Sequence, residues 1–332
     1  MTRNNSSNRA AGLILLRKTS LALLLCASLG IPAFAEPAMD WVQKMSDAMR
    51  NLNYRGNFVY MHENQLESMQ ISHVRDDNGE KERLISLNGE AREVIRDNLN
   101  LTCIWPSSRK VVVDSSRKNS FSPIFIPEDI ARIEKFYEMQ LVGDDRIAGM
   151  DTVVVHIKPR DRYRYGMKFW INKEHGLMMK SALLNEQGQE IEQVMFTSLK
   201  LFGPGEQLEL DVMPKIDENY TLVRYHSGEK AGGEVSTSRW QLDNAPGGFW
   251  RESVLQRKVP GSDHVVEQLV YTDGLASLSI FIERNNNGSH QGGSSMGAVN
   301  AFIRIYDDHS VTAIGEVPAV TVQRVAESVT YQ

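Results

Sequence analysis

A serine motif near the end of the chain is the first candidate for chemistry. Gly293-Ser294-Ser295-Met296-Gly297 satisfies the G-x-S-x-G spacing of a nucleophile elbow. That motif needs a buried strand before the serine and a helix after it, which together hold the hydroxyl in a strained, exposed turn. Here a polar run rich in Gly and Asn precedes the motif, and a strand-like segment follows it. The context favours a loop, so a hydrolase that uses Ser295 is the weakest of three functional hypotheses.

Metal, phosphate and acid–base chemistry have no better candidates. The eight histidines are dispersed, and His62-Glu63 lacks the second histidine of an H-E-x-x-H zinc motif. No glycine-rich phosphate cradle occurs. The carboxylate pairs Asp76-Asp77 and Asp144-Asp145 fall in turn-like segments and are expected to face solvent. We therefore expect a protein that is not an enzyme, with no catalytic residue, metal site or cofactor.

Aromatic side chains stand out in the first part of the chain. In a small sandwich of a sheet and helices they would fill the core, whereas in a half-open barrel they would line a cavity for an acyl chain. Residue type alone favours the core, and the lipid site remains open as the alternative. The candidate lipid-lining residues are Phe58, Tyr60, Trp105, Phe125, Phe136, Trp170 and Phe196.

Arginine and aromatic residues cluster in the second part of the chain, which is notable because the chain is net acidic. This combination is enriched at protein interfaces. A solvated strand face with scattered charge explains the cluster equally well. The candidate partner-binding residues are Arg239, Arg251, Arg257 and Tyr271.

The elements that must position these residues are mostly strands. Residues 38–52 are predicted to form a helix because Val42, Met45 and Met49 recur at helical spacing, with Asp40 as the N-cap. Short apolar segments with tight turns follow at roughly ten-residue spacing, which is typical of a meandering antiparallel sheet. Residues 127–139 interrupt them with helical spacing. The fold class is therefore α+β, with a sheet that curls.

A second domain is predicted beyond a polar stretch that opens with Gly203-Pro204-Gly205. It contains strands, a hairpin at Asp273-Gly274, a loop over residues 285–297 that we expect to be mobile, and a short C-terminal helix. The predicted domains are a signal peptide (1–35), an N-terminal domain (36–202), a linker (203–220) and a C-terminal domain (221–332).

The first 35 residues are typical of a secretory signal. Arg3, Arg9, Arg17 and Lys18 precede a short apolar run, and Ala33-Phe34-Ala35 forms a small-x-small cleavage site. Cleavage there removes Cys26 and changes the formal net charge from −5 to −9. Cys103 is then the only thiol, and we expect it to be a small residue within a strand. These features predict a periplasmic location, and the acidic charge argues against nucleic-acid binding.

Nine short segments, spread over both halves of the chain, carry a further signal through their order and spacing. They are Leu87–Val94, Phe136-Tyr137, Leu141–Gly143, Arg146–Gly149, Pro159–Gly166, Leu183–Gly188, Pro246–Phe249, Tyr271–Leu275 and Val311–Pro318. Together they resemble the MucB/RseB family of periplasmic regulators of extracytoplasmic-stress sigma factors.

The resemblance implies a fold and a function. The N-terminal domain would be a half-open antiparallel β-barrel packed with helices, similar to LolA and LolB, and the C-terminal domain a smaller antiparallel sheet with a helix. The partner would be the periplasmic domain of a transmembrane anti-sigma factor of the RseA/MucA type, which the protein would shield from regulated cleavage. A lipid or lipopolysaccharide-like ligand would release it. A periplasmic lipid or lipoprotein carrier is the alternative function, and homo-oligomerisation is left open.

Overall fold

The computed structural model describes residues 37–63, 65–97, 100–114, 130–203, 219–225, 237–258, 265–285 and 291–332, with a few single positions between 205 and 210. The predicted signal peptide and most of the predicted linker lie outside these residues. None of the described helices combines the length and the hydrophobicity that are needed to cross a bilayer.

Helix α1 (Ala38–Asn51) confirms the periodicity in the sequence. Val42, Met45 and Met49 are buried on one face. The expected cap is wrong, however, because Pro37 occupies the N-cap position and Asp40 lies in the first turn. A carboxylate in the first turn still interacts favourably with the helix dipole. Asp40 therefore stabilises the N-terminus of α1 without being its N-cap.

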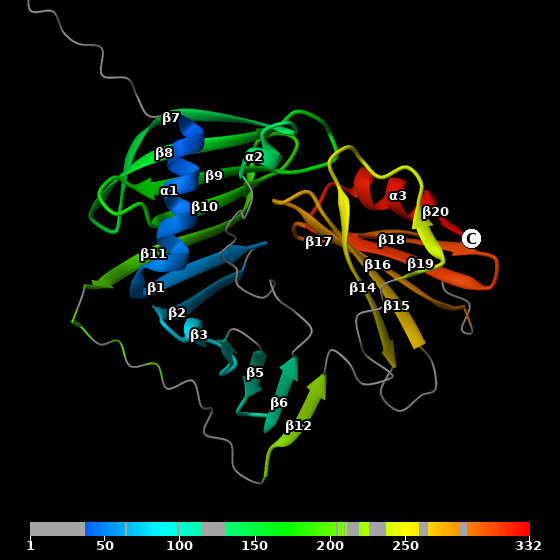
Figure 1. Cartoon of the computed structure of the whole chain (residues 1–332), viewed down its shortest axis with the longest axis horizontal. Coiled ribbons are helices and arrows are strands. Elements are labelled where there is room, and N and C mark those ends of the chain that lie inside the picture. Colours follow the sequence, from blue (N-terminus) through cyan, green and yellow to red (C-terminus); the bar gives the residue numbers. More distant parts are fainter. Residues whose placement is uncertain are drawn as a thin grey trace, which may run out of the picture. The chain divides into compact units, whose positions relative to one another are not determined.

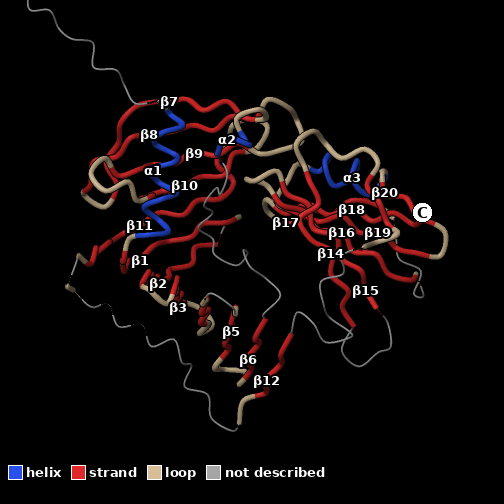
Figure 2. Tube along the Cα trace, in the orientation of Figure 1, coloured by secondary structure: helices blue, strands red, loops and turns tan. Residues whose placement is uncertain are grey.

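The first sheet consists of two meanders that meet in its middle. The strands of one meander are β1 (Asn53–His62), β2 (Gln65–Asp76), β3 (Gly79–Ser86), β4 (Glu93–Arg96), β5 (Leu101–Trp105) and β6 (Lys110–Asp114). Those of the other are β7 (Tyr137–Ile147), β8 (Met150–Pro159), β9 (Gly166–Asn172), β10 (Met178–Leu184) and β11 (Glu190–Phe202). Antiparallel pairing of β1 with β11 joins the two into one sheet (Figures 1 and 2).

A twelfth strand, β12 (Thr221–Tyr225), completes this sheet. It pairs in parallel with β6 and therefore lies in the first sheet, although residues 221–225 belong to the predicted C-terminal domain. Strands β12 and β7 are at the two ends of the strand order, and no pairing between described strands connects them. The described part is therefore an open sheet, and the half-open barrel stays a prediction.

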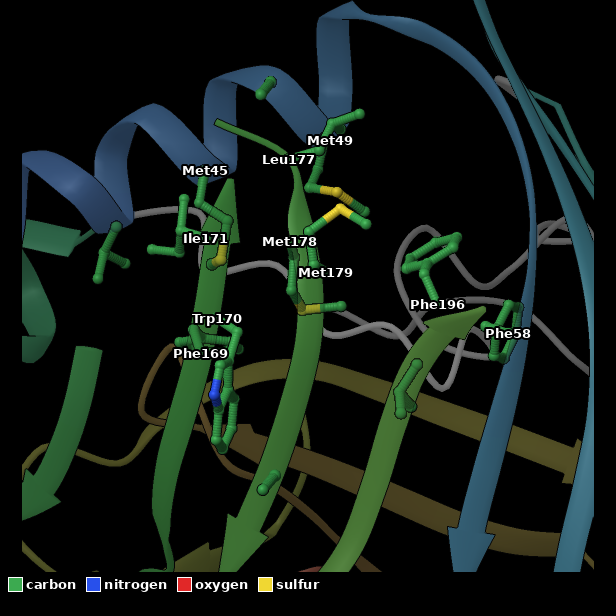
Figure 3. Packing of buried hydrophobic residues seen from close by; sticks show 14 of the residues in the cluster. Met45, Met49, Phe58, Phe169, Trp170, Ile171, Leu177, Met178, Met179 and Phe196 are labelled. Carbon is green, nitrogen blue, oxygen red and sulfur yellow. The ribbon is translucent and has the colours of Figure 1, made fainter. Parts of the chain in front are cut away.

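The core of the first sheet lies between α1 and the strands beneath it. Met45 and Met49 point from the helix toward the strands that carry Trp170 and Met178, as Figure 3 shows. Unbranched methionine side chains fill irregular gaps between a helix and a sheet well. Cys103 on β5 is buried with only 8% of its surface exposed, as expected for a small residue in a strand.

The second sheet has six antiparallel strands in the order β14-β15-β16-β19-β18-β17. They are β14 (Trp250–Lys258), β15 (Val265–Thr272), β16 (Ser277–Arg284), β17 (Gly292–Met296), β18 (Val299–Tyr306) and β19 (His309–Gly315). Helix α3 (Ala319–Glu327) covers one face, where Val322 and Val325 are buried in the same cluster as Leu269 and Ile280. Strands β13 (Trp240–Leu242) and β20 (Val329–Tyr331) form a small separate pair.

Two expectations for local structure are wrong. The predicted mobile loop over residues 285–297 contains strand β17, which pairs with β18 along its whole length. Of the predicted helix over residues 127–139, the described part contains one helical turn, α2 (Ile130–Ile133), and strand β7 begins at Tyr137. In both cases pairing with a neighbouring strand outweighs the local preference of the segment.

A charged network is half-buried within the first sheet. The Glu80 carboxylate accepts hydrogen bonds from His73 at 3.3 Å and from Arg96 at 2.5 Å. The His73 ring is buried, and it stacks on Tyr54 with 5.0 Å between ring centroids. Burial by itself would raise the pKa of Glu80, but the hydrogen bonds from His73 and Arg96 and their charges outweigh it. They lower this pKa from 4.5 to about 2.

We predict that Glu80→Gln destabilises the chain in a pH-dependent way. The lowered pKa means that the folded chain favours the carboxylate, so this stabilisation is present above about pH 4.5 and is lost as the pH falls toward 2. Urea unfolding at pH 7 should therefore show a clear loss of stability in the variant, and the difference should shrink at pH 3. Glu190→Gln, which removes a half-exposed partner of Lys180, serves as the control. An equal difference at both pH values would contradict the prediction.

Candidate functional site

The largest fully buried side chain in the described residues is the arginine Arg164, between β8 and β9. Its Nη1 donates to Asp273 Oδ2 at 2.8 Å, and its Nε donates to Asp161 Oδ1 at 3.1 Å. Its Nη2 donates to the carbonyl oxygen of Gly247. All three nitrogens of the guanidinium therefore have an acceptor, as burial of this charge requires.

Asp273 is equally buried and is held by its own turn. The side chains of Arg164 and Asp273 both have 0% of their surface exposed. Asp273 Oδ1 accepts from the backbone N–H groups of Leu275 and Ala276, which shapes the predicted hairpin between β15 and β16. Asp273 Oδ2 also accepts from the Tyr137 hydroxyl at 2.9 Å. Burial and the Asp273 charge raise the pKa of Tyr137 far above its usual value, so this hydroxyl keeps the proton that it donates.

Aromatic rings enclose the guanidinium of Arg164. Its central carbon lies 5.0 Å from the ring centroid of Phe136, 5.1 Å from that of Phe249 and 5.4 Å from that of Tyr137. Ring faces at these distances attract a cation, the more so away from water. Gly248 completes the enclosure, because a Cβ atom at this position would lie 2.6 Å from the Phe136 ring. We call the assembly of Arg164, Asp273, Tyr137 and the adjacent rings the Arg164 junction.

Further polar contacts join the same strand-connecting segment to the second sheet and its helix. The Asn300 side chain donates to the Tyr165 hydroxyl at 3.0 Å and to the carbonyl of Val317 at 2.8 Å. The Thr321 hydroxyl donates to the carbonyl of Tyr163 at 2.8 Å. Residues 161–165 are therefore bonded to four separate parts of the chain beyond residue 246: the segment before β14, the β15–β16 turn, β18 and α3.

The structure places six of the seven candidate lipid-lining residues in one hydrophobic cluster. Phe58, Trp170 and Phe196 are buried there, while Tyr60, Trp105 and Phe136 are half-buried at its margin. The rings of Phe58 and Phe196 are adjacent, with 5.7 Å between their centroids (Figure 3). Phe125 lies outside the described residues. Core packing accounts for this cluster, and a lipid-lining role remains a prediction.

The candidate partner-binding residues fall into two places, one on the second sheet and one beside the small separate pair of β13 and β20. Arg251 on β14 is exposed and lies directly across from Tyr271 on β15, whose side chain is buried. Arg257 lies farther along β14, and its side chain is outside the described set. Arg239 is exposed elsewhere and donates to the Tyr331 hydroxyl at 3.2 Å. The structure brings Arg251 and Tyr271 together and leaves Arg239 apart from them.

The serine motif lacks the geometry of a nucleophile elbow. Ser295 lies in strand β17, its hydroxyl donates to Asn300 Oδ1 at 2.5 Å, and strand β18 follows instead of a helix. The described residues also contain no group of three or more His, Cys, Asp or Glu side chains that could hold a metal ion. The most buried polar site among the described residues is the Arg164 junction, which joins the segment before β9 to the turn between β15 and β16.

Comparison with known proteins decides the family. A model described as the MucB/RseB N-terminal domain matches residues 37–216, and one described as the MucB/RseB C-terminal domain matches residues 234–330. The chain belongs to the MucB/RseB family. Within this family, the sigma factor AlgU regulatory protein MucB of Pseudomonas aeruginosa is 33% identical over 325 residues, which cover 95% of this chain and 98% of that protein. The sigma-E factor regulatory protein RseB of Escherichia coli is 26% identical over 292 residues, 87% of this chain and 89% of that protein.

Solved structures from the MucB/RseB family show the same fold. One is the Pseudomonas aeruginosa MucA/MucB complex, whose matching chain is 29% identical with a TM-score of 0.68 over 89% of this chain and 99% of that one. A crystal structure of MucB by itself is 27% identical with a TM-score of 0.65. The family is thus one of regulatory proteins by the names of its members.

Residue types and spacing do not predict Arg164 and Asp273 as a pair, although both lie within segments that resemble the MucB/RseB family. Segments Phe136-Tyr137, Pro159–Gly166, Pro246–Phe249 and Tyr271–Leu275 each place a residue in the Arg164 junction. A fifth, Val311–Pro318, contributes the Val317 carbonyl next to it. The sequence signal for this pair was that all of these segments occur in one chain. Residues far apart in the sequence form one motif only when they meet in the fold.

We predict that Arg164→Met destabilises the chain by about 3–5 kcal/mol, since it leaves the Asp273 carboxylate buried without its cation. Urea unfolding followed by tryptophan fluorescence measures the effect. Tyr137→Phe removes one neutral donor to that carboxylate and should cost about 1 kcal/mol. Arg160→Met, an exposed arginine in the same segment, should change stability by less than about 0.5 kcal/mol. Equal effects of Arg164→Met and Arg160→Met would contradict the prediction.

Proposed function

We propose that this chain is a periplasmic regulator of a sigma factor, and not an enzyme. It binds the periplasmic region of a membrane-bound anti-sigma factor of the RseA/MucA type and shields that region from regulated proteolysis. Lipid signals of envelope stress release it, and proteolysis then frees the sigma factor. The observation that carries the proposal is the similarity, over 99% of the matching chain, to MucB as it occurs in a complex with MucA.

The described geometry is compatible with binding and offers no catalytic constellation. A binder that stabilises the uncleaved form of a substrate needs affinity for that form, and a reactive centre adds nothing to this task. The Ser295 hydroxyl donates a hydrogen bond to Asn300 Oδ1, and no base lies among its described contacts to activate it. The basic strand β14, which carries the exposed Arg251, supports a surface for an acidic partner.

Release by lipid requires that the lipid and the partner favour different states of the chain, which is negative coupling between two sites. We place the lipid in the N-terminal domain (36–202), in a half-open barrel like those of LolA and LolB, lined by the aromatic residues around Phe58. We place the partner on the C-terminal domain (221–332). The Arg164 junction connects these regions, so it is the element through which one site would affect the other.

The direct test is protease protection of the purified anti-sigma periplasmic region. We expect the mature chain to slow its cleavage by the protease that makes the first regulated cut, and added lipopolysaccharide to restore that cleavage. Protection that lipopolysaccharide leaves unchanged would contradict the release step. Absence of binding at micromolar protein would contradict the function itself.

We predict that Arg251→Glu and Arg257→Glu each weaken binding of the anti-sigma region and make the remaining binding less sensitive to salt. A charge on a binding surface steers association, and salt screens that effect. Isothermal titration at low and high NaCl measures both quantities. Lys158→Glu, an exposed reversal on β8 of the first sheet, is the matched control and should leave the affinity unchanged. Unchanged affinity in both arginine variants would exclude this surface.

The alternative function is a periplasmic carrier of lipids or lipoproteins. It is supported by the sheet of the first domain with its aromatic cluster. The full chain would then transfer a lipoprotein from inner-membrane vesicles to an acceptor in the absence of any anti-sigma factor. Transfer at a rate that Arg251→Glu leaves unchanged, together with a failure to protect the anti-sigma region, would favour this alternative.

A further inference from the structure

A cleft lies beside helix α3, on the side that the segment before β9 covers. It is lined by Arg162, Tyr163, Val320, Gln323, Arg324 and Glu327, and its volume is about 270 Å³. The segment that carries Tyr163 is held against α3, because the Tyr163 carbonyl accepts a hydrogen bond from the Thr321 hydroxyl on that helix. We call this feature the Tyr163 cleft.

Two arginines from different elements converge on one ring in this cleft. The guanidinium carbon of Arg324 lies 5.1 Å from the centroid of the Tyr163 ring, and that of Arg162 lies 5.5 Å from it. Arg324 Nη1 donates to the Tyr163 hydroxyl at 2.9 Å, and its Nε donates to the carbonyl of Asn244. Two like charges are thus held close together, in a chain whose net charge is negative.

Among the described residues, neither Arg162 nor Arg324 forms an ion pair with a carboxylate. The ion pairs nearest to them are those of Arg164 with Asp161 and with Asp273. The one carboxylate in the cleft is Glu327, which accepts a hydrogen bond from Gln323 at 2.9 Å. The cleft therefore presents guanidinium donors that are held in position and have no anion to bind.

The positive charge of the cleft affects the pKa of the Tyr163 hydroxyl. A hydrogen bond from Arg162 is the largest influence on the Tyr163 pKa, and the charges of both arginines act in the same direction, so this pKa is lowered. The two guanidinium groups at this ring make the place favourable for a negatively charged oxygen, and the planar shape of a carboxylate matches the arginine fork.

We propose that the Tyr163 cleft binds a carboxylate side chain of an acidic peptide segment. This inference rests on the proposed function, since the segment would belong to the anti-sigma region. A peptide is favoured over a lipid because Val320 and the Tyr163 ring are the only apolar groups in the lining. A cleft of about 270 Å³ holds one acidic side chain and is below the usual size of sites for larger ligands.

Binding there would act directly on the Arg164 junction. Tyr163 and Arg164 are neighbours in the chain, and Asp161 accepts from the backbone N–H of Tyr163 as well as from Arg164. A carboxylate that draws Arg162 and Arg324 together also strengthens the contact between α3 and this segment. The peptide would therefore stabilise the arrangement in which the junction is closed.

The test uses the mature chain with a fluorescein-labelled tetra-glutamate peptide and its tetra-glutamine counterpart, followed by fluorescence anisotropy. We expect tetra-glutamate to bind, tetra-glutamine not to bind, and NaCl to weaken the binding. Arg162→Gln and Arg324→Gln should each weaken it about fivefold. Arg160→Gln, on the same segment but outside the cleft, should have no effect. Arg162→Gln removes an exposed guanidinium and keeps the test valid if Arg324→Gln disturbs folding.

Two further arms separate this inference from the proposed function. The anti-sigma region is titrated against the wild type and against the Arg162→Gln/Arg324→Gln variant. Equal affinities would overturn the inference and leave the function standing. No binding to either, with arginine-dependent binding of tetra-glutamate, would support the cleft and contradict the function. Vesicles of phosphatidylglycerol that bind through these arginines in place of tetra-glutamate would overturn the peptide in favour of a lipid surface.

Discussion

The ion pair between Arg164 and Asp273 sets conditions that much of the surrounding structure must satisfy. A buried guanidinium needs a protein acceptor for each of its nitrogens. Asp273 accepts from one nitrogen of Arg164, and the Gly247 carbonyl and Asp161 accept from the other two. The rings around it require a residue without a Cβ atom at Gly248. Buried pairs of this kind contribute little net stability, because desolvation of both charges offsets their attraction. What such a pair supplies is a single arrangement, since any other leaves a buried charge unpaired.

That property matters for a protein proposed to respond to two ligands. Coupling between distant sites needs an element with discrete arrangements that both ligands bias. A purely apolar contact between the two sheets could slide by small steps at small cost. A buried ion pair with all of its hydrogen bonds satisfied is either formed or broken. The Arg164 junction therefore has the all-or-none character that a release mechanism needs, and the Tyr163 cleft gives the partner a way to favour the formed state.

Local features were predictable from the sequence, and features that depend on distant partners were not. Helix α1 follows from the spacing of Val42, Met45 and Met49, and the Asp273-Gly274 turn follows from residue types that favour turns. Strand β17 was missed because its Gly- and Ser-rich sequence has low strand propensity, and β18 supplies the hydrogen bonds that extend it. Arg164 was missed because an Arg- and Asp-rich segment is usually exposed. Its acceptor Asp273 is 109 residues away.

Strand β12 has a consequence for how far the two sheets can separate. After β11 ends at Phe202, the chain is fastened again to the first sheet at Thr221–Tyr225 before it reaches β13 at Trp240. In the sequence, only residues 226–239 separate this last strand of the first sheet from β13, far fewer than the interval from 203 onward. Such a length spans at most about 50 Å when fully extended. The tethered second sheet would face its docking site at an effective concentration on the order of millimolar. Opening of the junction is then a readily reversed, intramolecular event, and a releasing ligand must compete with rapid recapture.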